Sequence, residues 1–172
     1  MEQLTDKTIA FIGLGLIGGS IARAVRHFYP DAEIIAYSRT RASVEQAVAD
    51  GVVDRIPDGV GEDFADCDYI FLCAPVSSNA KYLEQLKPLI HSSCIITDVG
   101  STKTDIHEKV TELGMEENFI GGHPMAGSEK SGYENIEIIV AIPFVGHDSK
   151  WPEQSQKRLK SLIQKATNCI VV

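Results

Sequence analysis

The chain has 172 residues, 44% hydrophobic and 23% charged, a composition typical of one soluble globular domain with a sizeable core. Its formal net charge of −8 argues against a nucleic-acid partner or an anionic membrane surface. No apolar run approaches the ~20 residues that span a membrane, and we expect no signal peptide. The four cysteines form no C-x-x-C pair, which favours reduced thiols, a cytoplasmic location and no metal site.

A glycine-rich turn follows the first predicted strand, residues 8–12, which is a short β-branched and aromatic run. Three glycines follow in the spacing G-x-G-x-x-G, and apolar residues at helical spacing begin at Ile17. Such glycines allow a tight turn, close approach of a pyrophosphate and close helix packing, with the helix N–H groups facing the phosphates. The alternative is a glycine-rich turn without a ligand. The predicted cofactor contacts in this turn are Gly13, Gly15, Leu16, Ile17 and Gly18.

Strands and helices alternate along the rest of the chain. The predicted strands are residues 33–38, 52–54, 69–74, 94–99, 119–121, 138–145 and 169–172. The predicted helices are residues 17–28, 41–50, 79–87, a segment capped at 101 or 102 that ends at 113, and 153–166. This order predicts an α/β fold of the Rossmann type: a doubly wound, mostly parallel sheet with helices on both faces. Its unusual loops all follow strands, so we expect one shared site at the carboxyl edge of the sheet.

The segment after the second predicted strand bears on the choice of dinucleotide. A fold specific for NAD usually carries an acidic residue there, and this chain has none. A hydroxyl followed by guanidinium groups suits a 2′-phosphate instead, so the cofactor is predicted as NAD or NADP, with the local residues favouring NADP. The alternatives are that Arg39 and Arg41 begin a solvated helix, or that Arg39 stacks on adenine. The predicted contacts are Ser38, Arg39 and Thr40.

One of the five histidines, His123, differs from the rest in its backbone setting. It follows a strand end and two glycines, and Pro124 comes directly after it. Histidine can take up a proton near neutral pH, and removing a hydride from an alcohol needs a base on the hydroxyl. The residues alone leave two interpretations open, a general base and a structural loop histidine.

Four motifs closely resemble those of the prephenate and arogenate dehydrogenase family of tyrosine biosynthesis. They are GLGLIGGS at 13–20, CAP at 73–75, DVGSTK at 98–103 and GGHPMAGSEKSG at 121–132. The resemblance covers essentially the whole chain in order, and the last motif is long and specific. It implies that prephenate is oxidised with NAD or NADP and loses carbon dioxide to give 4-hydroxyphenylpyruvate. Arogenate would give tyrosine by the same route.

The resemblance also implies roles for particular residues. His123 matches the base that deprotonates the substrate hydroxyl, and Ser101 matches the serine that bonds both this histidine and that hydroxyl. A plain helix cap at Ser101 and a surface charge at Glu129 are the alternatives. The residues implied to meet the substrate are Ser101, His123, Ser128 and Glu129, and those implied to meet the nicotinamide are Ala74, Pro75 and Val76.

The chain departs from the family pattern at its carboxyl end. The family carries a second, mostly helical domain that supplies a substrate-binding arginine and forms a homodimer, and this sequence stops at residue 172. We therefore expect residues 1–172 to be one NAD(P)-binding domain without that dimerisation domain, weak or inactive on its own with its small-molecule substrate. The alternatives are another hydroxyacid or imine reductase, and a non-catalytic dinucleotide-sensing module.

Overall fold

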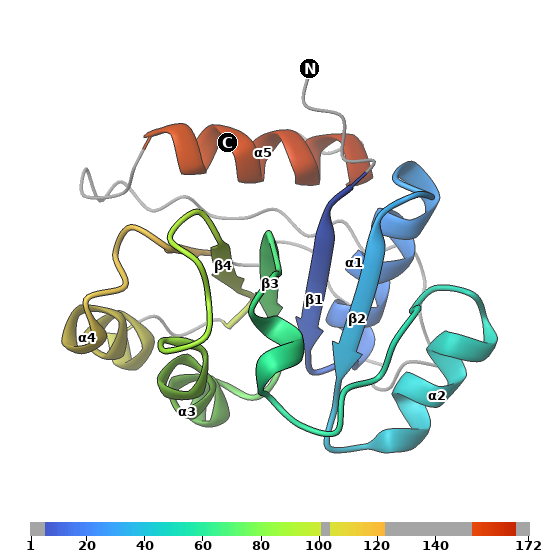
Figure 1. Cartoon of the computed structure of the whole chain (residues 1–172), viewed down its shortest axis with the longest axis horizontal. Helices are drawn as coiled ribbons and strands as arrows, with labels where there is room; N and C mark the ends of the chain where they lie inside the picture. The colour runs from blue at the N-terminus through green and yellow to red at the C-terminus, as the bar shows by residue number, and fades with distance from the viewer. Residues whose placement is uncertain (1–5, 101–103, 123–152, 168–172) are drawn as a thin grey trace.

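A computed structural model describes residues 6–100, 104–122 and 153–167. The described strands form one parallel sheet in the order β2-β1-β3-β4-β5 (Figure 1). The strands are β1 (Thr8–Ile12), β2 (Glu33–Tyr37), β3 (Tyr69–Leu72), β4 (Ile95–Asp98) and β5 (Phe119–Gly121). The helices are α1 (Leu16–Phe28), α2 (Arg41–Ala49), α3 (Val76–Leu86), α4 (Thr104–Leu113) and α5 (Glu153–Thr167), with a short 3-10 helix η1 (Glu62–Phe64).

The direction of the chain across the sheet decides which face each helix covers. β2 lies on one side of β1, whereas β3, β4 and β5 follow one another on the other side. Because crossovers between parallel strands are right-handed, α1 lies on one face and α3 and α4 lie on the opposite face. α3 and α4 contact each other, and α5 packs beside α1 (Figure 1). The sheet is therefore covered on both faces, which confirms the predicted doubly wound α/β fold.

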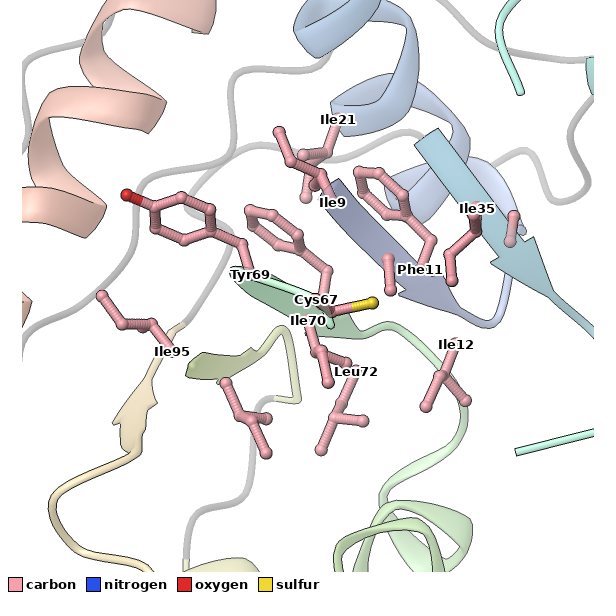
Figure 2. Packing of buried hydrophobic residues seen from close by; sticks show 14 of the residues in the cluster. Ile9, Phe11, Ile12, Ile21, Ile35, Cys67, Tyr69, Ile70, Leu72 and Ile95 are labelled. Atoms are coloured by element: carbon pink, nitrogen blue, oxygen red, sulfur yellow. The ribbon is translucent and has the colours of Figure 1, made fainter. Parts of the chain in front are cut away.

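The central strands are buried as strands covered on both faces should be. All four residues of β3 and four of the five in β1 are buried. Phe11 lies on the α1 side of the sheet with Ile21, whereas Ile12 and Leu72 point to the other side (Figure 2). The rings of Phe11 and Phe71 stack with their centroids 5.0 Å apart. This packing fixes the two strands whose carboxyl ends carry the candidate site.

The predicted strand at residues 52–54 is wrong. The N–H groups of its first two residues both bond the carbonyl of Ala47 in α2, at 2.9 and 3.2 Å. The chain therefore turns at the end of α2 and reaches β2 at residue 54, whose N–H bonds the carbonyl of Ile34 (2.8 Å), and Arg55 then forms an isolated bridge with Ile35. The apolar residues here belong to the buried core without extending the sheet.

Other boundaries differ less. α3 begins at Val76, ahead of the predicted start at residue 79, because the fixed backbone of Pro75 (φ −53, ψ 141) serves as its N-cap. Most strands are shorter than predicted by one or two residues. The predicted strands at 138–145 and 169–172 lie outside the described residues.

The described cysteines Cys67, Cys73 and Cys94 are free thiols, as predicted. Burial raises the pKa of Cys67 to about 12 and also raises the pKa of Cys94 well above its usual range, so these thiols are neutral at physiological pH. Within the described ranges, no helix is long and apolar enough to cross a membrane.

Candidate functional site

The strand order reverses between β1 and β3, and the site is built where their carboxyl ends lie side by side. In open α/β sheets, ligands bind in the crevice at such a reversal. The turn after β1 is held from both sides. Gly13 donates its N–H to the carbonyl of Tyr37 at the end of β2 (2.8 Å), and Cys73 donates to the carbonyl of Ile12 (2.8 Å).

Gly13 has a backbone conformation and surroundings that exclude a side chain. Its φ is +95°, in the region that L residues rarely adopt. A Cβ at this position would lie 2.6 Å from the Ala74 nitrogen and 2.7 Å from the Cys73 carbonyl carbon. The turn after β1 therefore presses directly on the backbone that leaves β3.

Gly18 allows α1 to start close to the same turn. A Cβ there would collide with the carbonyl oxygen of Gly13 and would lie 3.0 Å from the Cβ of Cys73. The sequence predicted close packing between this helix and the strand before it. The structure shows that the close contact is with the turn itself and with the end of β3.

Gly15 differs from both, because a Cβ added to it would meet no atom within 4 Å. It is the exposed N-cap residue of α1, and the first turn of that helix carries no acidic side chain. The first intrahelical bond runs from the Gly19 N–H to the Gly15 carbonyl (2.8 Å), so the N–H groups at Leu16 and Ile17 have no acceptor within the helix. Free donors, the positive end of the helix dipole and open space over Gly15 suit an anion such as a diphosphate.

The predicted contacts after β2 lie beside this turn, because β2 pairs with β1 along its full length. Ser38 is half-buried and Arg39 is exposed. Thr40 is the N-cap residue of α2, but its side chain makes no capping hydrogen bond. The Arg41 guanidinium forms an ion pair with Glu45 (3.0 Å) and a longer one with Asp58 (3.6 Å) on the following loop. In the described part of the chain, no carboxylate forms an ion pair with Arg39.

Two aromatic residues that are not among the predicted contacts meet close to the end of β2. The rings of Tyr37, from β2, and Tyr82, from α3, meet edge to face with centroids 6.2 Å apart. Burial, with Tyr37 close by, raises the pKa of Tyr82, while Arg39 acts in the opposite direction. The β2 end and α3 are therefore adjacent here. No local motif could have indicated this, because the two tyrosines are far apart in the sequence.

The predicted nicotinamide contacts follow β3. Pro75 is exposed, and Ala74 and Val76 are half-buried at the start of α3. The first turn of α3 also carries Asn79, which lies on the sheet-facing side with Leu83. Asn79 is fully buried, and neither polar atom of its side chain has a hydrogen-bond partner in the structure.

The end of β4 carries Asp98, which is not among the predicted site residues. Asp98 is fully buried, and its carboxylate accepts the N–H of Gly100 (3.0 Å) and the N–H of Gly122 (3.2 Å). These two glycines directly precede Ser101 and His123 in the sequence. The four predicted substrate contacts lie outside the described residues; they are Ser101, His123, Ser128 and Glu129. In the ranges that the structure covers, no group of three or more His, Cys, Asp or Glu side chains is placed to hold a metal ion.

These features define the class of protein: an α/β domain of the Rossmann type whose strand-order reversal is built as an anion-binding turn. A family model described as prephenate dehydrogenase, nucleotide-binding domain, matches residues 21–137. The chain belongs to this family, which confirms the resemblance seen in its motifs.

Individual relatives agree with the family assignment. The chain is 37% identical over 176 residues to a prephenate dehydrogenase of Bacillus subtilis (strain 168), a match that covers 98% of this chain and 46% of that protein. A solved structure of prephenate dehydrogenase from A. aeolicus, in complex with hydroxyphenyl propionate and NAD+, matches at 25% identity and TM-score 0.80 over 93% of this chain and 57% of that one. Synechocystis arogenate dehydrogenase matches at 32% identity and TM-score 0.77, with the same coverage. The chain spans about half the length of these relatives.

Proposed function

We propose that this domain binds NAD or NADP for a dehydrogenase that oxidises prephenate, with arogenate as the alternative substrate. The observation that carries the proposal is the turn after β1. Gly13 and Gly18 are locked against the end of β3, while Gly15 leaves open space over free helix N–H groups. Membership of the prephenate dehydrogenase family and the similarity to a structure solved with NAD+ support the same assignment.

The residues present fit a nicotinamide dinucleotide. Leu16 and Ile17 offer backbone donors to the diphosphate, and Ala74, Pro75 and Val76 lie across the strand-order reversal, where the nicotinamide would be held. When bound, this cofactor supplies a hydride acceptor. No basic field is needed for binding, since the donors are local backbone groups.

We propose that the cofactor is NADP rather than NAD. Arg39 is exposed beside the half-buried Ser38, and no ion pair to a described carboxylate neutralises it. The Thr40 side chain does not cap α2, so the backbone N–H groups of the first turn of α2 can also donate to a phosphate bound beside Arg39. Arg41 contributes less, because Glu45 already engages its guanidinium.

The proposed chemistry assigns the proton to His123. Its imidazole accepts the proton of the ring hydroxyl while the carbon that bears this hydroxyl gives up its hydride to the nicotinamide, and the carboxylate on the opposite ring carbon leaves as carbon dioxide. The ring becomes aromatic and the proton returns to the phenol oxygen, so atoms and electrons balance. Ser101 would hold both the imidazole and the hydroxyl, and Ser128 and Glu129 would border the substrate. We further propose a cytoplasmic location and a homodimer for a full-length enzyme that contains this domain.

The test measures binding and then turnover. Titration calorimetry with NAD+ and NADP+ should give saturable binding of both, tighter for NADP+. Formation of reduced nicotinamide is then followed with prephenate, with arogenate and with a simple 2-hydroxyacid. We expect slow formation of reduced nicotinamide with prephenate or with arogenate, and none with the simple 2-hydroxyacid. Failure to bind either dinucleotide overturns the cofactor assignment, and reduction with the simple hydroxyacid alone overturns the substrate assignment.

A further inference from the structure

Asp98 is a buried carboxylate that connects two loops. It ends β4, is fully buried, and stands opposite Gly121 of β5 in the sheet register. A buried charge is costly unless hydrogen bonds stabilise it. Two backbone N–H groups do so here, from Gly100 in the loop after β4 and from Gly122 in the loop after β5. Such charge-assisted bonds are about twice as strong as neutral ones.

The two loops come together although the whole of α4 separates them in the sequence. Gly122 can approach because it lacks a side chain: a Cβ there would collide with the backbone oxygen of Asp98 and would lie 3.1 Å from the hydroxyl of Thr97. Each anchored glycine immediately precedes a residue that the proposed function uses, Gly100 before Ser101 and Gly122 before His123. One carboxylate thus bonds the backbone directly before each of them.

We propose that Asp98 is a positioning residue: it holds Gly100 and Gly122 together, and these are the residues that directly precede Ser101 and His123 in the sequence. This inference rests on the proposed function, which gives those two residues their roles. Asp98 acts through the backbone, one residue upstream of each. A carboxylate suits the task because both of its oxygens accept, whereas an asparagine has one acceptor and would turn an NH₂ group toward the second N–H.

The competing explanation is that Asp98 merely stabilises the fold. Asp68 provides a matched control, because its carboxylate also accepts a backbone N–H, from Thr8 at 3.1 Å, and also bonds Lys7. It lies just before β3, at the amino end of the sheet and away from the loops under discussion. Asp68→Asn therefore removes a comparable structural bond without touching either loop.

The experiment compares Asp98→Asn and Asp68→Asn by NMR of the isotopically labelled chain. In Asp98→Asn we expect the amide signals of Gly100, Ser101, Gly122 and His123 to shift and their hydrogen exchange to quicken, and the titration of the His123 ring to move. Asp68→Asn should leave those signals in place. NAD+ or NADP+ affinity should change by less than about threefold in both variants, because the turn after β1 is intact. Unmoved Ser101 and His123 signals in Asp98→Asn overturn the inference.

Two further measurements keep the result decisive. If Asp98→Asn does not fold, hydrogen exchange of the unmodified chain replaces it: a Gly122 N–H that exchanges as fast as an exposed amide contradicts the bond on which the inference depends. In the turnover assay, Asp98→Asn should lower kcat by about 10²-fold with little change in KM, as a misplaced reacting group does. His123→Gln separates the two proposals. If His123→Gln has unchanged turnover, the proposed function is wrong. If His123→Gln loses turnover while Asp98→Asn keeps normal turnover, only the positioning role of Asp98 is wrong.

Discussion

Gly18 packs directly on the carbonyl oxygen of Gly13, so that the helix α1 begins in contact with the turn that precedes it. A methyl group at residue 18 would have to displace backbone atoms rather than a flexible side chain. Gly18→Ala should therefore lower the free energy of unfolding by about 1–3 kcal/mol or more, as overpacking does. Urea denaturation of the chain measures this. A variant as stable as the parent would show that the turn is looser in solution.

Gly15→Ala, in the same glycine-rich turn, should affect dinucleotide binding rather than stability. Its Cβ would meet nothing within 4 Å, and the backbone at this N-cap has an ordinary negative φ of −86°. Stability should therefore change by less than about 1 kcal/mol. The methyl group would instead occupy the space above the free N–H groups, and dinucleotide affinity should fall tenfold or more, roughly the effect of one lost charge-assisted bond. Calorimetric titration of the folded variant provides the measurement, and unchanged affinity would contradict a phosphate site here.

Asn79 offers a prediction about stability. Both polar atoms of its side chain are buried without a partner in the structure, on a helix face that is otherwise apolar. Burying an unpaired amide costs about 1–3 kcal/mol in proteins. Asn79→Leu, which keeps the same branched arrangement of heavy atoms and replaces both polar atoms with methyl groups, should raise the free energy of unfolding of the ligand-free chain, by an amount reduced by the extra volume of the methyl groups. Leu83→Asn, one turn along, is the matched control and should lower it. A less stable Asn79→Leu variant would show that water or another group satisfies the amide in solution.

The sequence predicts the strands of this domain well where the signal is local. The first strand (residues 8–12) and the strand at 119–121 were predicted to the residue, because each is an apolar run bounded by turn residues. Residues 52–54 have the same local signal, but the carbonyl of Ala47 in α2 accepts the first two of their N–H groups, and only the third bonds β2. Local hydrogen bonds at the end of α2 overrode β propensity there.

The residues of the candidate site also differ in whether a local sequence signal predicts them. The turn that contains Gly13 has a spacing that identifies it, since every contact it needs is nearby in the chain. Asp98 and Asn79 have no such signature, because a lone polar residue at a strand end or on a helix face is common. Their importance depends on segments that only the folded sheet brings together, such as Gly100 and Gly122.

Cys67 makes stability depend on pH. Burial raises its pKa from the ordinary value of 9.0 to about 12, so the folded chain holds this proton where the unfolded chain has released it. Stability from this group is complete below pH 9.0 and is lost progressively between 9.0 and about 12, by up to about 1.4 kcal/mol per pH unit. Urea unfolding at a series of alkaline pH values measures the slope. Cys67→Ala should make the slope shallower without abolishing it, because burial also raises the pKa of Cys94, and an equal slope in both proteins would exclude Cys67 as a contributor.

Arg39 should decide between the two dinucleotides. Its guanidinium is exposed and without an ion pair among the described residues, whereas Arg41 is held by Glu45 at 3.0 Å. A charged hydrogen bond to a 2′-phosphate is worth about 1.5–3 kcal/mol, which corresponds to roughly 10-fold to 100-fold in affinity. Arg39→Gln should weaken NADP+ binding by that factor and leave NAD+ within about threefold. Arg41→Gln, the matched control, should change both affinities little.

The salt dependence of binding separates this explanation from stacking of Arg39 on adenine. A phosphate contact adds charge–charge attraction that screening weakens, so the preference for NADP+ over NAD+ should shrink as salt is raised. Stacking would act on the adenine that both cofactors share. Arg39→Gln would then weaken NAD+ and NADP+ equally, at every salt concentration, and the assignment of a 2′-phosphate site after β2 would be wrong.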